Sequence, residues 1–294
     1  MIPKISIIIP TYNRENIVSH TLDSVINQIF QEWECIVVDD YSTDSTYKVL
    51  LEYAKRDVRF KILKNERKKG ACGARNTGLY HATSDLIQFF DSDDEMKPEL
   101  LSELYNNLSI DVDVITCWTN VVDFDTGKVI KKFENITEGN IHSDLMSEKT
   151  YVDTNCALIR KKVVENVGGW SEDCPSYQEW DFHLKLSAIA KYKTHRKHLI
   201  NYNVGGADTI SKSLPRYVAG RLYILNKYKS EFVCKHIISY LKKMLTIYYM
   251  ILNSNENNEK RNMMNMFVDN TDLLTRILVK CLYIPYCFLK YERK

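Results

Sequence analysis

The sequence predicts an α/β protein whose sheet is doubly wound and mostly parallel, followed by a C-terminal helical extension. The first observation is that strand-length apolar runs alternate with amphipathic helical segments over residues 1–95. The second is that these runs are rich in β-branched residues with little polar alternation, which is typical of strands buried on both faces. Such strands are joined by right-handed crossovers, so their carboxyl ends meet at one edge of the sheet.

Residues 1–95 contain four predicted strands and two predicted helices. The strands are Ile5–Ile9, Glu34–Val38, Phe60–Leu63 and Leu86–Phe90. The first helix places its apolar residues Val18, Leu22, Val25, Ile26 and Ile29 on one face. The second, Asp44–Arg56, begins with capping residues and directs Val49, Leu50 and Tyr53 inward.

Residues 96–215 predict shorter and more varied elements. A helix is expected from Pro98 to Leu108, and residues 135–149 carry no strong periodicity. The other expected elements are a strand Val112–Trp118, a hairpin of Val121–Phe124 with Lys128–Phe133, a strand Cys156–Ile159, and a helix Lys161–Val167 ended by Gly168 and Gly169.

Composition narrows the functional class. With 294 residues and 45% hydrophobic content, the chain can form one large domain or a domain with a smaller appendage. Forty basic and 38 acidic residues give a net charge of +2, which argues against nucleic acid as a partner. The eight cysteines have no zinc-type spacing, the N-terminal apolar run stops at Pro10, and no run is long enough to span a membrane. We therefore expect a cytoplasmic protein with reduced thiols.

The strand ends supply the candidate site residues. They are Pro10, Thr11, Tyr12, Asn13 and Arg14 after the first strand, Asp39, Asp40 and Ser42 after the second, Asn65 and residues 70–76 with Arg75 after the third, and Asp91, Ser92, Asp93 and Asp94 after the fourth. Tyr12 can stack on a base, Asp39 can accept hydrogen bonds from base or ribose, and Arg75 can balance a diphosphate. The sheet is therefore predicted to be Rossmann-like and nucleotide-binding. Loop packing of Tyr12, helix capping by Asp40 or Ser42, and a structural ion pair of Arg75 remain alternatives.

The fourth strand end concentrates negative charge. Asp91, Asp93 and Asp94 fall within four residues, and like charges at close range raise each other's pKa unless a cation compensates. Oxygen ligands favour Mg²⁺ or Mn²⁺, and two carboxylates leave coordination positions for substrate phosphates. The alternative is a solvated acidic turn that caps the helix after Pro98.

Four segments in this order resemble glycosyltransferase family 2, the inverting enzymes of the GT-A fold. They are Ile-Ile-Ile-Pro-Thr-Tyr-Asn, Val-Val-Asp-Asp-Tyr-Ser-Thr-Asp, Gly-Ala-Arg-Asn-Thr-Gly and Phe-Phe-Asp-Ser-Asp-Asp. The resemblance covers residues 3–215 and implies a catalytic domain 1–215, divided into a nucleotide-binding half 1–95 and an acceptor-binding half 96–215, with a helical extension 216–294.

The resemblance also implies roles for the strand-end residues. A nucleoside diphosphate, usually UDP in this family, would be held by Thr11, Tyr12, Arg14, Asp39 and Arg75, with Pro10 and Ser92 beside them. Asp91 would reach the ribose or the metal, and Asp93 would be the principal metal ligand.

A second constellation lies at residues 177–184. Glu179 falls in the first turn of a predicted helix, where a carboxylate interacts favourably with the helix dipole. Members of the family often carry Glu-Asp-Tyr/Trp-Asp here, with the second acidic residue as catalytic base. This chain has Gln178-Glu179 before Trp180, so Glu179 takes the base position and Asp181 remains the alternative. His183 is expected to be a helix-face residue.

Two later segments complete the expectations. Residues 203–211 resemble the loop that closes over the donor in this family, and His195 or His198 could complete a metal shell. Leu273–Leu289 mixes apolar and aromatic residues with Arg276 and Lys280, which suits a helix on an anionic membrane surface or one docked on its own catalytic domain.

The resemblance thus implies a cytoplasmic, metal-dependent inverting hexosyltransferase, which moves a sugar from a UDP-sugar to a glycan or lipid-linked glycan in cell-surface polysaccharide synthesis. It would be peripheral at the inner face of the plasma membrane if the C-terminal helix binds there. A sugar-nucleotide pyrophosphorylase would need a glycine-rich phosphate loop after the first strand, and a dehydrogenase would need Gly-x-Gly-x-x-Gly; neither is present. A non-catalytic glycan- or nucleotide-binding subunit is the alternative from another class.

Overall fold

The computed structural model describes residues 2–205, 213–254 and 256–291, with side chains described as far as Tyr283. The chain divides into two compact units. The first comprises residues 1–172 and 179–209, and the second comprises residues 173–178 and 210–294.

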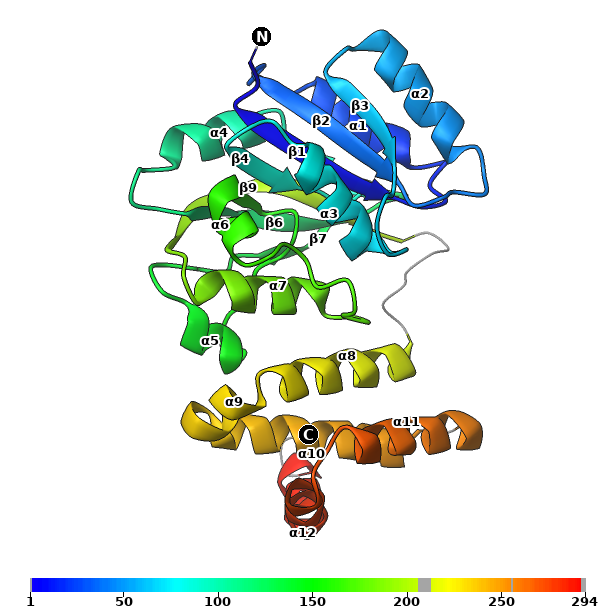
Figure 1. Cartoon of the computed structure of the whole chain (residues 1–294), viewed down its shortest axis with the longest axis vertical. Helices are drawn as coiled ribbons and strands as arrows, with labels where there is room; N and C mark the ends of the chain where they lie inside the picture. The colour runs from blue at the N-terminus through cyan, green and yellow to red at the C-terminus, as the bar shows by residue number, and fades with distance from the viewer. Residues whose placement is uncertain (1, 206–212, 255, 292–294) are drawn as a thin grey trace. The chain divides into compact units, whose positions relative to one another are not determined.

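The strands of the first unit form a single sheet. Their bounds are β1 (Ile5–Thr11), β2 (Trp33–Asp39), β3 (Phe60–Lys64), β4 (Leu86–Phe89), β5 (Glu95–Met96), β6 (Val114–Asp123), β7 (Val129–Phe133), β8 (Ala157–Arg160) and β9 (Tyr192–Val204). Within the described residues the sheet has nine strands in the order β3-β2-β1-β4-β8-β6-β9-β5, with β7 paired to β6 (Figure 1). β1 to β4 are mutually parallel, whereas β8 runs antiparallel to both β4 and β6.

The core of the sheet lies in β1 and β2, where every residue is buried. Ile7, Ile8 and Ile9 of β1 and Ile36 of β2 have no exposed surface. Apolar side chains on both faces are therefore shielded, as their continuous β-branched sequence predicted. The first four predicted strands are confirmed, with ends that differ by one or two residues.

Helices of varied length accompany the sheet. Their bounds are α1 (Val18–Ile26), α2 (Thr46–Arg56), α3 (Ala71–His81), α4 (Leu100–Asn107), α5 (His142–Met146), α6 (Lys161–Asn166) and α7 (Gln178–Ser187). In Figure 1, α3 lies in front of the sheet, where it packs on β1 and β2. α3 therefore brings its N-terminal residues to the carboxyl edge of these strands.

Two local expectations were wrong. α1 ends at Ile26, and Ile29, expected on its buried face, is 62% exposed because the chain leaves the helix at Asn27. Residues 71–81 form α3, a helix that the sequence did not predict. The segments 112–118 and 121–124 were expected as separate strands, yet they form the single strand β6 because β9 pairs with it along its whole length.

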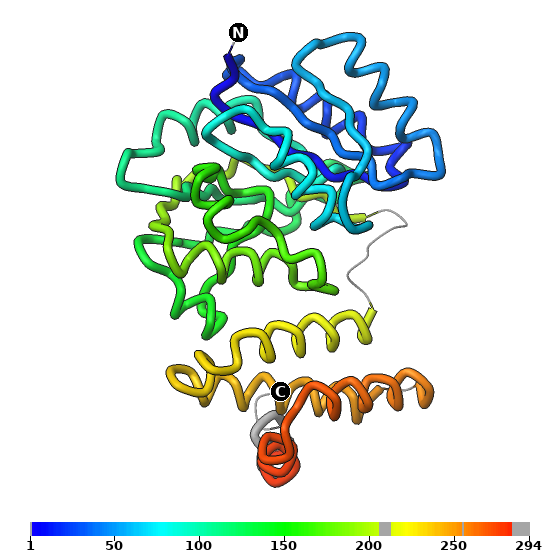
Figure 2. The backbone as a smooth tube through the Cα atoms, in the orientation of Figure 1, coloured from blue at the N-terminus to red at the C-terminus, as the bar shows by residue number. Residues whose placement is uncertain are grey.

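The second unit is helical. Its helices are α8 (Leu214–Lys227), α9 (Lys229–Lys235), α10 (Ile237–Leu252), α11 (Asn257–Asp269) and α12 (Leu273–Tyr291). Figure 2 follows the backbone through them from yellow to red, and α10 packs against α9, α11 and α12. Val279 of α12 and Ile247 and Ile251 of α10 are fully buried, so α10 forms the centre of this unit.

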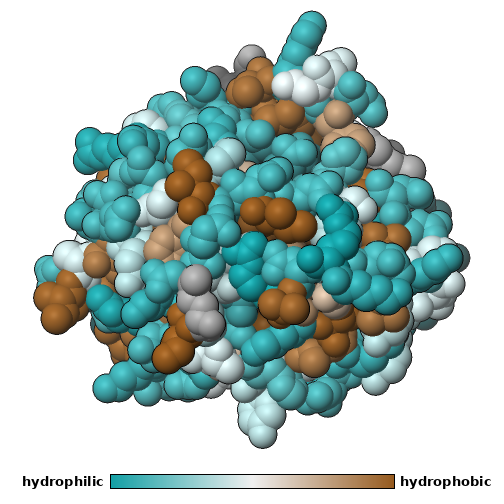
Figure 3. All heavy atoms as spheres, turned by 90° about the horizontal axis from the view of Figure 1, so that it is seen from above, coloured by the Kyte–Doolittle hydropathy of each residue, from teal (hydrophilic) through white to brown (hydrophobic). Residues whose placement is uncertain are grey.

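Apolar surface is unevenly distributed. The face in Figure 3 is mostly hydrophilic, with apolar residues in small separate groups. α12, by contrast, exposes Leu273, Leu274 and Ile277 to 65, 66 and 48%. None of the described helices is both long and apolar enough to cross a membrane.

Candidate active site

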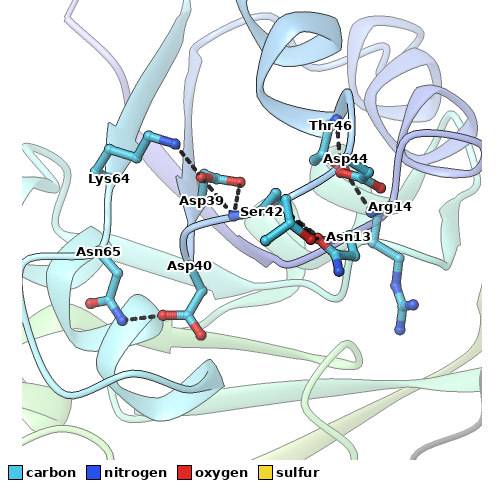
Figure 4. A network of polar contacts seen from close by, with 10 residues as sticks. Asn13, Arg14, Asp39, Asp40, Ser42, Asp44, Thr46, Lys64 and Asn65 are labelled. Carbon is cyan, nitrogen blue, oxygen red and sulfur yellow. Dashed lines mark hydrogen bonds and ion pairs between the residues drawn. The ribbon is translucent and has the colours of Figure 1, made fainter.

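Hydrogen bonds join the loops after β1 and β2. Asn13 donates its backbone N–H to Ser42 Oγ at 3.0 Å, and its Oδ1 accepts the backbone N–H of Thr43 at 2.8 Å (Figure 4). Arg14 donates its backbone N–H to Thr46 Oγ1 at 2.6 Å. These bonds cross from one strand end to the next, so the two loops are held as one surface.

Asp39 and Asp40 lie at the base of this surface. The buried Asp39 carboxylate accepts hydrogen bonds from Ser42 N–H and from Lys64 Nζ, the latter at 2.6 Å. Asp40 accepts from Asn65 Nδ2, also at 2.6 Å (Figure 4). Asp39 therefore has structural partners as well as its predicted place beside a base or ribose.

Pro10, Thr11 and Tyr12 lead from β1 into the first loop. Pro10 and Thr11 are buried, and Thr11 Oγ1 has no hydrogen-bond partner among the described residues. Tyr12 is 42% exposed, and Lys69 Nζ lies 4.9 Å from the centroid of its ring. A hydroxyl group without a partner and an exposed ring beside a cation are suited to a nucleotide phosphate and base.

The turn after β4 brings carboxylates and arginines together. Arg75 Nη2 lies 2.7 Å from Asp91 Oδ1, and Arg14 Nη2 lies 3.5 Å from Asp93 Oδ2. The side chains of Asp91 and Asp93 are 29 and 41% exposed. Burial and the charge of Asp91 raise the pKa of Asp93, which the nearby Arg14 partly opposes.

These two carboxylates fit the divalent cation that the sequence predicts. Asp91 and Asp93 present partly exposed oxygen ligands on one turn. Burial and the neighbouring Asp91 charge raise the pKa of Asp93, and a bound cation would stabilise its ionised form. No cluster of three or more His, Cys, Asp or Glu side chains is positioned for a metal within the described parts of the chain. A metal here would therefore need further ligands from substrate or water.

Two asparagines fix the conformation of the turn. Asn155 accepts the Asp91 N–H on Oδ1 at 2.7 Å and donates through Nδ2 to Asp94. Asn203 at the end of β9 donates its N–H to Asp94 Oδ1 at 2.8 Å and its Nδ2 to the Asp93 carbonyl at 2.9 Å. Asp94 is 1% exposed and Ser92 is 6% exposed, so both lie inside this turn.

An aromatic stack links the turn to α7. The Arg75 guanidinium lies 4.4 Å from the centroid of the Trp170 ring, which stacks on Phe182 with centroids 4.0 Å apart and an interplanar angle of 8°. Phe89 at the end of β4 contacts both rings edge to face. Because Phe182 belongs to α7, the same stack that supports Arg75 fixes the helix that carries Glu179.

The two acidic residues of α7 differ in environment. Glu179 is partly exposed and lies in the first turn, where Thr154 Oγ1 donates to its Oε1 at 3.4 Å. Asp181 is completely buried. Burial lowers the pKa of Arg75, whereas the charges of Asp91 and Glu179 raise it, and the net shift is upward. Glu179 is therefore close enough to Arg75 for its charge to act on the guanidinium.

Asp153 is a site residue that sequence reasoning missed. Burial and the charges of Glu179 and Asp91 raise its pKa from 3.8 to about 7. It lies in the segment just before β8, whose antiparallel pairing brings it to the end of β4. The only signal available was an acidic residue preceding a short apolar run.

The histidines named in the sequence analysis have partners other than the candidate metal ligands. His195 Nε2 is 2.9 Å from Glu103, and His198 Nε2 is 3.2 Å from Glu134. His183 is buried with Nδ1 3.0 Å from the Tyr192 hydroxyl, and burial lowers its pKa to about 3. Of the predicted closing loop 203–211, residues 206–211 lie outside the described residues.

The site can hold an anion, a cation and a base side by side. The arginines, carboxylates and Glu179 come from the loops after β1 and β4 and from α3 and α7, although they are widely separated in sequence. Such a set can neutralise a departing diphosphate and accept a proton from a hydroxyl group.

Sequence comparisons relate the chain to known proteins. The profile described as Glycosyl transferase family 2 matches residues 6–168. The chain is 43% identical over 110 residues to UDP-Glc:alpha-D-GlcNAc-diphosphoundecaprenol beta-1,3-glucosyltransferase WfgD of Escherichia coli, covering 36% of this chain and 43% of that protein. It is 40% identical over 101 residues to the putative teichuronic acid biosynthesis glycosyltransferase TuaG of Bacillus subtilis (strain 168), covering 34 and 40%. The matches thus span less than half of these relatives.

Solved structures share the fold. S. aureus TarS 1-349 in complex with UDP-GlcNAc has a TM-score of 0.62 at 22% identity, covering 91% of this chain and 72% of that one. Mannosyltransferase PcManGT from Pyrobaculum calidifontis, in complex with GDP-Man and Mn2+, has a TM-score of 0.57 at 13% identity, covering 97 and 88%. The GT-A fold with a C-terminal helical region, predicted from the sequence, is confirmed.

Proposed function

The chain belongs to glycosyltransferase family 2, and on that basis we propose that it transfers a hexose from a UDP-sugar to a hydroxyl group of a glycan or lipid-linked glycan, with inversion at the anomeric carbon. The observation that carries the proposal is the convergence of Asp91, Asp93 and Arg75 with Glu179. Phosphate-binding groups and a base on separate elements are what a single displacement requires.

The donor side is proposed from the strand-end residues. Tyr12 would stack on the uracil, Asp39 would accept a hydrogen bond from base or ribose, and Arg14 and Arg75 would bind the diphosphate. Thr11 Oγ1, which has no partner among the described residues, supports a polar ligand at this edge. UDP-GlcNAc bound to TarS, similar in fold, is consistent with this class of donor.

Asp91 and Asp93 would hold Mn²⁺ or Mg²⁺. When bound, such an ion neutralises charge on the diphosphate leaving group. Arg75 contributes a second positive charge from a buried position, and its stacking on Trp170 holds the guanidinium in place. The arginine therefore needs little reorganisation when charge develops on the leaving group.

Glu179 would be the general base. Its carboxylate is partly exposed, whereas Asp181 is completely buried and cannot reach an acceptor without rearrangement. Thr154 Oγ1 donates to Glu179 Oε1 and so orients the carboxylate. The proton of the acceptor hydroxyl group would pass to Glu179 as that oxygen bonds to the anomeric carbon and the bond between this carbon and the diphosphate breaks to release UDP.

The acceptor is proposed to be a cell-surface glycan or its lipid-linked precursor, as the names of WfgD and TuaG indicate for those proteins. The apolar stripe of α12, which consists of Leu273, Leu274, Ile277, Leu278 and Leu282, would rest on the inner face of the plasma membrane. Lys280, exposed at its margin, suits anionic lipid headgroups.

Nucleotide binding tests the proposal directly. UDP-, GDP- and TDP-sugars are compared by thermal shift with Mn²⁺ and with EDTA, since a ligand at 100 times its Kd adds about 2.7 kcal/mol of stability. We expect UDP-sugars to give the largest shift, and Asp93→Asn to remove the part that depends on Mn²⁺. Lys128→Gln, on the β6–β7 turn, is the control. Equal shifts for all nucleotides, or transfer that is unchanged in EDTA, would contradict the proposal.

A further inference from the structure

Lys64 covers the carboxylate that we assign to the donor nucleotide. Thr11, Asp39 and Lys64 are the last residues of β1, β2 and β3, and they lie side by side in register. Lys64 Nζ lies 2.6 Å from Asp39 Oδ2, and in Figure 4 its side chain points at that carboxylate. The Asp39 side chain has no exposed surface, whereas the Lys64 side chain is 39% exposed. A base can therefore reach Asp39 only if the Lys64 ammonium moves aside.

The Asp39 carboxylate is fixed by the backbone, whereas Lys64 has alternative partners. The Ser42 N–H donates to both Asp39 oxygens, at 3.3 and 3.2 Å. Lys64 Nζ lies 3.7 Å from the ring centroid of Tyr47 and 5.9 Å from that of Tyr41, which is 55% exposed. An ammonium beside aromatic rings is still stabilised when it leaves a carboxylate, and the flexible lysine stem allows the shift. Lys64 can therefore move off Asp39 without losing all of its partners.

A ligand that separates this ion pair must offer each charge a new partner, because a buried charge left without one is costly. Asp39 then needs a hydrogen-bond donor, and Lys64 needs an acceptor beside it. Uracil presents these two groups in that order along one edge, with its N3–H next to its O4 carbonyl. Cytosine presents the reverse, an unprotonated N3 next to an amino group, so each charge would face a group of the wrong kind.

We propose that Lys64 selects the base of the donor. On binding, its ammonium shifts from Asp39 Oδ2 to the O4 carbonyl of uracil while Asp39 accepts the N3–H, and cytosine nucleotides are rejected. The inference rests on the proposed transfer from a UDP-sugar and names the residue that decides between the pyrimidine bases. Tyr12 contributes stacking, which any base can provide, so the choice is left to the pair of Asp39 and Lys64.

The test compares UDP with CDP by calorimetry in the presence of Mg²⁺. The two nucleotides share ribose, diphosphate and ring size, so the ratio of their Kd values reports on this edge of the base. We expect the unaltered protein to bind UDP about 100-fold more tightly than CDP. Lys64→Met keeps the length of the side chain without its charge, and it should reduce that ratio about tenfold because a hydrogen bond to a charged group is lost.

A second variant serves if Lys64→Met does not fold, since that change leaves the buried Asp39 without its counter-charge. Lys64→Gln retains a polar group, and its amide can donate to the O4 carbonyl of uracil or accept from the amino group of cytosine. The Kd ratio should therefore fall in Lys64→Gln as well. The Tm of each variant shows that the protein used for calorimetry is folded.

Lys61→Met is the matched control. Lys61 lies on the same strand with its Nζ 2.6 Å from Glu34 Oε2, and the two side chains are 46 and 5% exposed. Glu34 is the second residue of β2 and Asp39 is the last, so Lys61→Met removes a similar ion pair away from the candidate site. The Kd ratio should be unchanged in this variant.

The inference is overturned if Lys64→Met and Lys64→Gln keep the Kd ratio of the unaltered protein, or if the unaltered protein binds UDP and CDP equally. Tighter binding of UDP in Lys64→Met would also overturn it, because Lys64 would then only obstruct Asp39. An equal fall of the ratio in Lys61→Met would attribute the effect to lost charge in general and so overturn it too. Failure of the unaltered protein to bind UDP would instead refute the proposed function.

Discussion

Two carboxylates on one turn of α7 have different surroundings although they are two residues apart. Glu179 is partly exposed and accepts a hydrogen bond from Thr154, while Asp181 has no exposed surface. Successive helical positions diverge by about 100°, so residues two apart project to nearly opposite sides. This geometry separates a candidate base from a residue of the interior.

Glu179→Gln is expected to lower kcat by about 10² to 10⁴, the range for loss of general base catalysis. The amide keeps the shape of the side chain but cannot accept the proton. Donor affinity should be nearly unchanged because the proposed nucleotide-binding residues lie on other elements. Steady-state kinetics for kcat and calorimetry for the donor Kd give the two readouts.

Asp181→Asn is the matched control for Glu179. Because Asp181 is buried, the expected effect is a lower Tm, with kcat per folded molecule largely retained. If Asp181→Asn were inactive while Glu179→Gln kept substantial activity, the base would have to be reassigned to Asp181.

Asp153→Asn should stabilise the protein more at pH 8 than at pH 4.5. The pKa of Asp153 is raised from 3.8 to about 7, so between these values the folded state holds a proton that the unfolded state has released. The free energy of unfolding therefore falls as pH rises through this window. The variant escapes this loss, which we put at about 1 to 3 kcal/mol after allowing for solvent screening.

Thermal unfolding of both proteins in EDTA at the two pH values checks this dependence. Other titrating groups are common to both proteins and largely cancel in the difference between their Tm values. A Tm difference that is the same at pH 4.5 and pH 8 would show that Asp153 ionises normally.

Single residues were predictable where they follow parallel strands. Asp91, Asp93 and Arg75 come from segments whose position at the sheet edge follows from strand order. Asp153 and Asn155 were not predicted because they precede an antiparallel strand, and nothing in the sequence reveals the direction of β8. The hydrogen bonds of Asn155 to the Asp91–Asp94 turn likewise depend on that direction.

At the level of elements, α3 depends on close backbone contacts. A Cβ at Gly73 would lie 1.9 Å from the Lys68 carbonyl oxygen. Gly73→Ala is therefore expected to destabilise the protein by about 1 to 3 kcal/mol, as overpacking does, and to weaken UDP binding by displacing Arg75. Denaturant unfolding and UDP titration measure the two effects.

Whether Gly73→Ala destabilises or stabilises the protein shows whether the loop before α3 is held in place. In an unconstrained helix, alanine in place of glycine stabilises by about 1 kcal/mol. Stabilisation in Gly73→Ala would therefore show that the loop before α3 can move away. Tyr80→Ala, on the exposed side of the same helix, provides a control with no such contact.

Elements whose apolar residues recur with a clear period, or form a continuous run, were predicted. Elements that depend on tertiary contacts were not. β1 and β2 follow from their β-branched sequence alone. α3 contains Gly73 and Gly78, which lower helix propensity, yet it forms because both glycines allow close packing, Gly78 against Ile8 of β1. β5 is a strand of two residues that exists only through its pairing with β9.

For the whole molecule, we predict from the exposed apolar side chains of α12 that the protein binds membranes. The double variant Leu274→Glu/Ile277→Glu changes side chains that are 66 and 48% exposed and should leave Tm unchanged. Binding to phosphatidylglycerol vesicles should fall at least tenfold, since each apolar side chain of this size contributes about 1.5 to 3 kcal/mol when fully buried. Vesicle sedimentation measures the change.

Val268→Glu, at a position 39% exposed on α11, is the control for added charge. It should affect sedimentation much less than the double variant. Unaltered protein that fails to sediment with anionic vesicles would contradict the membrane proposal. Substitution is preferable to removing α12, because Val279 is buried and truncation would disturb the packing against α10.

The pairing of β9 with both β6 and β5 has a consequence for how the protein is made. One edge of β6 pairs along its length with β9, and β5 pairs with β9 on the other side, so both wait for residues 192–204 to leave the ribosome. Until then the growing chain carries an open strand edge, the kind of surface that promotes association between chains. Synthesis of β1 to β4 is finished long before. The late arrival of β9 is therefore the step at which nascent chains most need protection by chaperones.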